Sequence, residues 1–256
     1  RRMHLEIEHL SHTFAGRPPR AALAELSFTV PSGQFTAVIG PSGCGKSTLL
    51  RLAAGLLPVQ AGSLLLGGQT PAQAGAQRRV AWMAQSPALL PWRTVRDNVL
   101  LALRFLPAGH AARLSVDEAL ARVGLSDSAN AYPFMLSGGM QQRLALARTL
   151  MLDAGLWLMD EPFAALDELT RERLTHELLD LWQAQRPTVL WVTHHIQEAL
   201  RLADRVVVLS PRPARLLLDL PVELPRPRPE SSPAFQALLG RLRAALGLAA
   251  APTEGA

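Results

Sequence analysis

The stretch Gly40-Pro-Ser-Gly-Cys-Gly-Lys-Ser-Thr48 has residue types and a spacing that could hold phosphate groups. It fits the pattern G-x-x-x-x-G-K-[ST], in which glycines let backbone N–H groups approach a triphosphate at a helix N-terminus. Lys46 would reach the β- and γ-phosphates, and the Ser47 hydroxyl would bind Mg²⁺. The alternative is a plain glycine-rich turn. The predicted nucleotide-binding residues of this stretch are Gly40, Pro41, Ser42, Gly43, Cys44, Gly45, Lys46, Ser47 and Thr48.

Composition supports a special role for Lys46. The chain has 26 basic residues, and Lys46 is the only lysine among them. A compact ammonium at this position suits a phosphate site, because the planar guanidinium of arginine is bulkier and needs a different geometry.

Two adjacent carboxylates form a second candidate for chemistry. The apolar run 156–159 leads into Asp160 and Glu161, which indicates a buried parallel strand with acids at its carboxyl end. Ligands of open α/β sheets bind at that edge. Asp160 would support Mg²⁺, and Glu161 would orient and deprotonate an attacking water. The alternative is that the two acids only begin a turn.

A second anion-binding end is predicted about ninety residues after the first. Leu136, Ser137, Gly138, Gly139 and Met140 precede a helical pattern, so exposed N–H groups would again meet a negative charge. One chain would thus carry two separate phosphate-type sites.

The elements that must position these residues alternate between strands and helices, which predicts an α/β fold. Expected strands cover residues 4–9, 26–30, 35–39, 63–66, 80–84, 156–159, 188–193, 205–209 and 215–220. Expected helices cover residues 47–54, 95–106, 168–185, 196–203 and 233–246, with two more beginning after Ser115 and Ser137. Thr94 and Ser115 are expected N-caps, and Gly55 is expected just beyond the end of the first helix. We expect Phe14 in a loop, and Leu169, Leu174, Leu178, Leu181 and Trp182 on the core face of the helix at 168–185.

Composition excludes several classes of protein. The 256 residues are 48% hydrophobic, and prolines and glycines interrupt every long uncharged stretch, so no membrane-spanning helix is expected. The single cysteine, Cys44, excludes an internal disulfide, and the first residues lack an apolar signal core; both favour a cytoplasmic protein. A net charge of +5 invites a nucleic-acid hypothesis, but no basic cluster interleaved with aromatic residues is present. We interpret the dense arginines of residues 201–228 as solvated, and attraction to an anionic membrane surface is compatible with them.

With these motifs in order, the sequence resembles the ATP-binding subunits of ATP-binding-cassette (ABC) transporters over residues 3–225. The motifs are the phosphate loop at 40–48, Gln85 in Met-Ala-Gln-Ser-Pro, the signature at 136–140, the acids of 156–161, Ala165-Leu-Asp167 and His194. The resemblance implies a P-loop NTPase core with a mainly parallel sheet, an N-terminal antiparallel β subdomain and a helical subdomain at about 86–152. Residues 226–256 would form a linker, a short C-terminal helix and a tail.

The resemblance also implies roles for single residues. Gln85 would contact Mg²⁺ beside Ser47 and Asp160, and His194 would hold the γ-phosphate and the attacking water. Phe14 stands where the family has an aromatic residue that stacks on adenine. Lys46, Glu161 and His194 would carry catalysis. Two departures are visible: His195 stands where an acid is usual, and Met140 replaces the more general glutamine.

The partners implied by the resemblance are a second copy or a homologous ATPase, an integral membrane permease and a periplasmic or lipoprotein substrate-binding protein. In this family the signature of one subunit caps ATP on the other, in a head-to-tail dimer. The segments after Gln85, around Asp160 and after Leu209 resemble nitrate, sulfonate and taurine importers. The protein would then be peripheral, at the cytoplasmic face of the inner membrane, with ATP and Mg²⁺ as ligands.

Two other functions share part of the pattern. An ABC-type ATPase of DNA repair or chromosome maintenance would insert long coiled coils between the phosphate loop and the signature, and that interval is short here. A nucleotide-binding module without turnover would not need Glu161 and His194 together. We expect no nucleic-acid partner.

Overall fold

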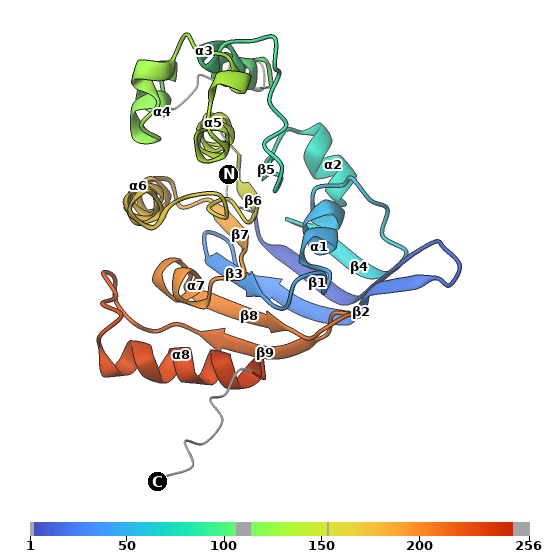
Figure 1. Cartoon of the computed structure of the whole chain (residues 1–256). Coiled ribbons are helices and arrows are strands. Elements are labelled where there is room, and N and C mark those ends of the chain that lie inside the picture. The colour runs from blue at the N-terminus through green and yellow to red at the C-terminus, as the bar shows by residue number, and fades with distance from the viewer. Residues whose placement is uncertain (1–2, 106–113, 153, 248–256) are drawn as a thin grey trace.

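The chain folds into two sheets with helices around them (Figure 1), and the computed structural model describes residues 3–105, 114–152 and 154–247. The first sheet is antiparallel. Its strands, in pairing order, are β2 (Arg20–Val30), β1 (Leu5–Phe14) and β4 (Ala61–Leu66). β1 is longer than predicted, so Phe14 is the last residue of a strand, and its expected place in a loop is wrong. Pairing with both neighbours extends β1, and such pairing is invisible in a local apolar pattern.

The second sheet is mainly parallel and forms the centre of the molecule. Only its edge strand β9 is antiparallel, and it pairs with β8. The strands, in pairing order, are β5 (Val80–Met83), β6 (Leu156–Asp160), β7 (Thr188–Val192), β3 (Phe35–Ile39), β8 (Arg205–Leu209) and β9 (Leu216–Pro221). β3, β6 and β7 are buried along their whole length, as expected for parallel strands covered on both faces.

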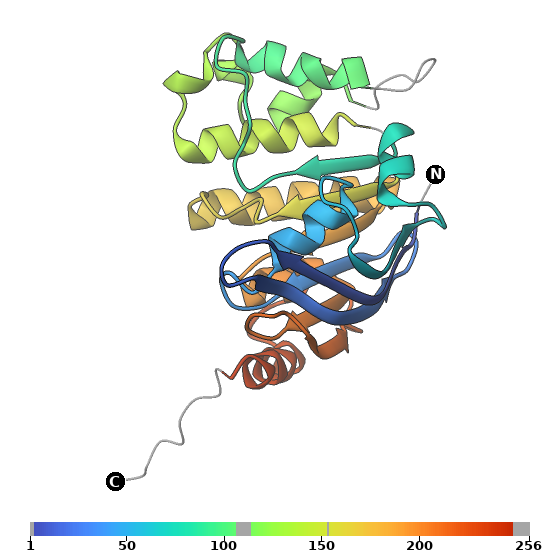
Figure 2. The ribbon, with the colours of Figure 1, turned by 90° about the vertical axis from the view of Figure 1, so that its right-hand side faces the viewer.

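Each face of the parallel sheet has its own hydrophobic core, because successive strand residues point to opposite faces. On β6, Leu156 and Leu158 join the core that holds Leu49 and Leu50 of α1 (Lys46–Ala53). The alternate residue Trp157 joins the other core, with residues of α5 (Gly138–Leu150) and α6 (Glu168–Gln185). Because α1 lies between the two sheets (Figure 2), the start of α1 is fixed by both.

The second face is covered by α6 (Glu168–Gln185) and α7 (Ile196–Leu202). Four of the five predicted core residues of α6, among them Leu174 and Trp182, are buried, but Leu169 is 80% exposed. The prediction for Leu169 was wrong because it lies about 140° around the helix from Leu174, outside the apolar stripe. The short helix α2 (Pro71–Ala76) packs on β4.

A group of helices sits at one end of the parallel sheet, beyond β5 (Figure 2). Its members are α3 (Val95–Leu100), η1 (Leu101–Phe105), α4 (Val116–Arg122), η2 (Ser126–Ser128), η3 (Pro133–Met135) and α5 (Gly138–Leu150). The predicted caps Thr94 and Ser115 are confirmed, as is the left-handed Gly55 after α1. The single helix expected at 95–106 is instead α3 followed by a 3₁₀ turn, and its last residue lies outside the described residues.

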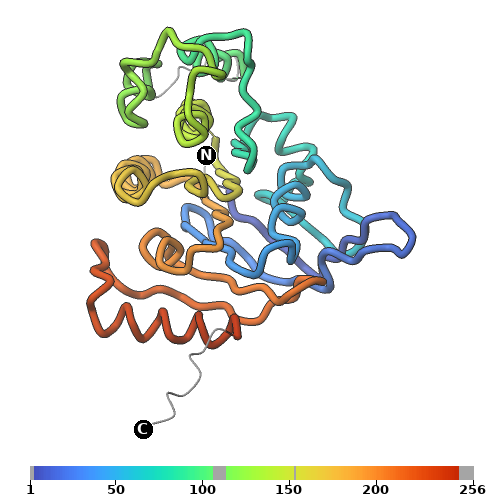
Figure 3. Tube along the Cα trace, in the orientation of Figure 1, coloured from blue at the N-terminus to red at the C-terminus, as the bar shows by residue number. Residues whose placement is uncertain are grey.

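The segment predicted as a linker is anchored to the core. Arg228 is 8% exposed and donates hydrogen bonds to the carbonyls of Leu200, Ala203, Val222 and Leu224. After this segment the chain turns back in α8 (Pro233–Ala245), which runs beside β9 (Figure 3). The interpretation of these arginines as solvated is therefore wrong for Arg228, because a guanidinium can replace its water by carbonyl acceptors.

Candidate functional site

The glycine-rich stretch forms the loop between β3 and α1, and the backbone needs glycine there. Gly45 has a φ of 131°, and a Cβ on it would lie 2.7 Å from the carbonyl oxygen of Ala22. A Cβ on Gly40 would lie 3.0 Å from the carbonyl oxygen of Leu209. The loop is thus pressed against β2 and the end of β8, which holds its N–H groups at the start of α1.

Lys46 is held inside this loop. It is 5% exposed, and its Nζ donates hydrogen bonds to the carbonyl oxygens of Gly40 at 2.7 Å and Pro41 at 2.9 Å. In the part of the chain that the structure describes, no carboxylate pairs with this ammonium. A buried cation that carbonyls hold and no anion neutralises is prepared for a phosphate ligand.

Asp160 lies at the end of β6 beside the loop. It is 3% exposed, and burial raises the pKa of its carboxyl group, although a hydrogen bond from the Ser47 hydroxyl opposes the shift. Its Oδ1 is buried and has no partner among the described residues. A carboxylate with an unused buried oxygen next to a hydroxyl has the chemistry of a Mg²⁺ site.

The described residues contain no cluster of three or more His, Cys, Asp or Glu side chains that could hold a metal alone. This fits Mg²⁺, which takes one or two protein oxygens and completes its shell with water and substrate phosphates. Ser47 and Asp160 would hold the ion, and Gln85 lines a cavity together with Ser47, although Asp160 itself does not line it.

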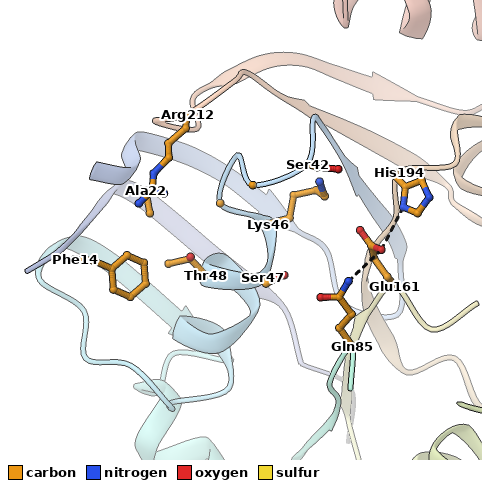
Figure 4. A pocket seen from close by; sticks show the side chains of 12 residues that line it. Phe14, Ala22, Ser42, Lys46, Ser47, Thr48, Gln85, Glu161, His194 and Arg212 are labelled. Atoms are coloured by element: carbon orange, nitrogen blue, oxygen red, sulfur yellow. Dashed lines mark hydrogen bonds and ion pairs between the residues drawn. The ribbon is translucent and has the colours of Figure 1, made fainter. Parts of the chain in front are cut away.

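Three further side chains meet at the carboxyl edge of the parallel sheet (Figure 4). Oε2 of Glu161 lies 3.2 Å from Nδ1 of His194 and 3.5 Å from Nε2 of Gln85. Gln85, Glu161 and His194 follow β5, β6 and β7, which are neighbours in the sheet. Strand order therefore brings together residues that are far apart in the sequence.

Glu161 is aimed by an unusual backbone conformation. Its φ is 48°, its N–H donates to the carbonyl oxygen of Val192, and its carbonyl accepts from Nε2 of Gln142. A non-glycine residue in the left-handed region is uncommon and is often found at functional sites.

The side chains of His194 and His195 line different cavities. His194 lines the cavity of the phosphate loop, whereas His195 lines a different one with Arg171 and Glu198. Burial, then the nearby His194, lowers the pKa of His195. The geometry thus supports the prediction that His194, and not its neighbour, faces the phosphates.

One cavity of about 300 Å³ joins these groups. Its lining residues are Phe14, Ala22, Ser42, Gly43, Gly45, Lys46, Ser47, Thr48, Gln85, Glu161, His194 and Arg212. Three predicted loop residues do not line it: Cys44 is buried under the loop, and Gly40 and Pro41 contribute the carbonyls that hold Lys46. Ala22 and Arg212 were missed by the sequence reasoning, because only the pairing of β2 with the turn after β8 brings them here.

The signature residues lie apart from this cavity, at the N-terminus of α5. Ser137 is the N-cap, and its Oγ accepts a hydrogen bond from the Met140 N–H at 3.3 Å. Ser137 and Gly138 are exposed, and a Cβ on Gly139 would lie 3.0 Å from the carbonyl oxygen of Ala165. None of the residues 136–140 is among those that line the cavity. The phosphate loop and the exposed start of α5 thus form two separate surfaces of the chain.

Among the helices of the described residues, none is both long and apolar enough to pass through a membrane.

Comparisons with known proteins agree with this geometry. A family profile described as ABC transporter matches residues 23–164. The aliphatic sulfonates import ATP-binding protein SsuB 1 of Pseudomonas fluorescens is 45% identical over 244 residues, which cover 95% of this chain and 87% of the relative. The taurine import ATP-binding protein TauB of Rhizobium johnstonii is 42% identical over 253 residues, which cover 94% and 96%.

A solved structure has the same fold. It is described as the dimeric post-hydrolysis state of the ATP-binding cassette MJ0796 bound to ADP and Pi. Its TM-score is 0.75 at 27% identity, and the match covers 86% of this chain and 99% of that one. The predicted P-loop α/β fold is confirmed. The phosphate loop, the carboxylate edge and these relatives together show that the chain belongs to the ABC transporter family, as one of its ATP-binding cassettes and an ATPase.

Proposed function

We propose that this chain is the ATP-hydrolysing subunit of an importer for a small anionic or zwitterionic solute, of the sulfonate, taurine or nitrate kind. The observation that carries the proposal is the convergence of Gln85, Glu161 and His194 opposite Lys46 in one cavity. The names of the relatives, which import taurine and aliphatic sulfonates, support the solute class.

In the proposed reaction the phosphate loop and Lys46 bind the triphosphate of ATP. The Glu161 carboxylate accepts a proton from water while the water oxygen bonds to the γ-phosphorus and the bond to the ADP oxygen breaks. His194 and Gln85, both close to the same carboxylate oxygen, fix its orientation. Mg²⁺ bound at Ser47 and Asp160 would neutralise charge on the phosphates.

We further propose that two chains act together, head to tail. The support is the separation of the α5 N-terminus from the cavity, since one chain presents both surfaces but does not join them. In the proposed dimer the partner is a second copy or a homologous ATPase. Ser137 and the glycines of one subunit close over ATP held by the other. The dimeric MJ0796 cassette is a precedent of the same fold.

The remaining partners are an integral membrane permease and a periplasmic or lipoprotein substrate-binding protein, which places this chain at the cytoplasmic face of the inner membrane. No relative or structure reported above is named for DNA repair, and we do not retain that alternative. Co-purification with a permease from solubilised membranes, followed by uptake of taurine, a sulfonate and nitrate in cells, tests the assignment. Wild-type uptake of all three in cells lacking this chain would contradict it.

Lys46 gives a direct test of nucleotide binding. Because it is the only lysine, an amine-directed reagent can modify only this side chain and the chain's N-terminus. We expect ATP to protect Lys46 from modification, measured by mass spectrometry of the peptide, with N-terminal labelling as the internal control. Lys46→Ala should lose ATP binding and turnover, whereas Arg241→Ala, on the exposed face of α8, should keep both. Equal labelling with and without ATP would refute the site.

A further inference from the structure

Arg212 lines the cavity and is charged, but it has no role in the proposed function. Arg212 comes from the turn between β8 and β9, far in the sequence from the phosphate loop. Figure 4 shows it at the end of the cavity where Phe14 and Ala22 lie, while Gln85, Glu161 and His194 lie at the other end. Since the latter three would act at the γ-phosphate, Arg212 lies at the end that would receive the nucleoside.

The turn that carries Arg212 is fixed to the strand beside the phosphate loop. Ala24 N–H donates to the carbonyl of Ala214 at 3.0 Å, and Ala214 N–H donates to the carbonyl of Ala22 at 2.9 Å. The same Ala22 carbonyl lies against Gly45 of the loop. Arg212 is therefore held in a constant position relative to the phosphate loop.

The guanidinium itself is anchored at one edge. Nε of Arg212 donates to the carbonyl of Ala21 at 2.8 Å, and Nη2 donates to the carbonyl of Arg20 at 3.3 Å. A guanidinium has five N–H donors, so these bonds fix its plane and leave donors unused. No carboxylate within the described residues forms an ion pair with it.

A planar cation that is held at one edge and lacks an acidic partner is suited to a base or a ribose. Nucleobases stack on the face of arginine as they do on aromatic rings, and ribose hydroxyls accept from N–H groups. Arginine gains from this arrangement because less side-chain entropy is lost when its position is already set.

We propose that Arg212 recognises the nucleoside of ATP, acting with Phe14 at the end of the cavity away from Glu161. The inference rests on the proposed binding of ATP. It makes Arg212 a determinant of the preference for a nucleotide over a bare chain of phosphates. The phosphate contacts stay with Lys46 and the loop.

Comparing two ligands distinguishes binding at the two ends of the cavity, because tripolyphosphate has the phosphates of ATP but no nucleoside. In EDTA, which prevents hydrolysis, calorimetry would measure binding of ATP and of inorganic tripolyphosphate. For Arg212→Ala we expect ATP affinity to fall about tenfold, whereas tripolyphosphate affinity stays as in the wild type. Arg215→Ala, an exposed arginine of the same turn that does not line the cavity, should leave both affinities unchanged.

Other results overturn the proposal. Unchanged ATP affinity in Arg212→Ala would exclude nucleoside recognition. An equal fall for ATP and tripolyphosphate would assign Arg212 to the phosphates or to support of the loop. A wild-type protein that binds neither ligand, in EDTA or with Mg²⁺ present, would instead refute the proposed function, and this is visible before any variant is compared.

A lysine variant separates recognition from structural support. In Arg212→Lys, the ammonium can still donate to the carbonyls of Arg20 and Ala21, so we expect the Tm of the wild type. The planar group is absent, so the loss of ATP affinity should persist. Full recovery of ATP affinity with lysine would show that charge alone acts there and would contradict recognition by the guanidinium plane.

Discussion

At the scale of single residues, the site depends on side chains in conformations that are costly without a ligand. Glu161 adopts a left-handed backbone, Asp160 keeps a buried oxygen without a partner, and Lys46 is buried among carbonyls. The left-handed backbone of Glu161 is held by the surrounding fold, whereas the buried charges of Asp160 and Lys46 would gain partners when a cation and phosphates bind. We therefore expect substitutions at these residues to reduce ligand binding or turnover without reducing the stability of the unliganded protein.

Glu161→Gln tests the proposed base. Glutamine keeps the shape of the side chain and can still meet Gln85 and His194, but it cannot accept the proton from water. We expect ATP affinity to remain within a few fold and turnover to fall at least about 100-fold, measured by calorimetry and phosphate release. Turnover near the wild-type rate would exclude Glu161 as the base.

Asp160→Asn should stabilise the protein without nucleotide. Burial raises the pKa of Asp160 above its ordinary 3.8, so the folded state disfavours the charged form. The resulting destabilisation is absent below pH 3.8 and builds up as the pH rises through the raised pKa. At pH 8 we expect a higher Tm for Asp160→Asn than for the wild type, and a difference that shrinks as the pH is lowered toward 3.8.

The same substitution should weaken Mg²⁺-dependent ATP binding, because the amide is a poorer ligand for a hard cation. Thermal unfolding across the pH range, with and without Mg²⁺-ATP, measures both effects. A lower Tm at pH 8 in the absence of ligand would contradict the account of Asp160 as a destabilising buried carboxylate.

At the scale of elements, the arrangement of neighbours decides what each motif does. β5, β6 and β7 lie side by side, so the residues that follow them form one edge. α7 begins two residues after His194, and the segment before α8 donates hydrogen bonds to carbonyls at the end of α7. Arg228 donates to the carbonyls of Leu200 and Ala203 at this end, where the helix dipole favours a positive charge.

Arg228→Met tests this anchor. Methionine keeps most of the volume, but it leaves carbonyls at the end of α7 without donors. We expect a loss of about 2–4 kcal/mol of unfolding free energy, and a fall in Tm of about 5–10 °C. Arg241→Met, on the exposed face of α8, is the matched control and should change Tm little. Equal Tm values for the two variants would contradict a stabilising role for these hydrogen bonds.

At the scale of the whole molecule, one chain presents two separate surfaces, the cavity and the start of α5, that it does not join by itself. The cavity opens at the edge of the parallel sheet, and the signature lies at the exposed start of α5. Two copies related head to tail would complete both sites at once, which agrees with the closed symmetry of most oligomers.

Ser137→Arg tests action between subunits. A bulky cation at the N-cap of α5 should block closure, so turnover should fall at least about tenfold while ATP affinity of the monomer is kept. Ser126→Arg, an exposed serine elsewhere among the helices, should leave turnover unchanged. When the Ser137→Arg and Glu161→Gln proteins are mixed, a dimer of one chain of each kind should have at most one working site. That site combines Glu161 of one chain with Ser137 of the other. An equal loss of affinity and turnover would argue for a role within one chain.

The motifs and most helices and strands could be predicted because their signals lie in consecutive residues. Glycine spacing, the apolar runs of β3 and β6, and the caps at Thr94 and Ser115 act over a few residues. Such local interactions can be recognised in the sequence without knowing which distant segments pack against them. The sequence thus determined the phosphate loop, the two acids at the end of β6 and the α/β class.

Only the tertiary structure decided how these parts meet. The pairing order of the strands placed Gln85, Glu161 and His194 together, and the pairing of β2 with a distant turn added Arg212. Burial of Arg228 and exposure of Leu169 depended in the same way on what each side chain faces. The physical reason is that pairing between distant strands, and the exchange of water for protein contacts, draw their free energy from the packing of the whole chain rather than from neighbours in sequence.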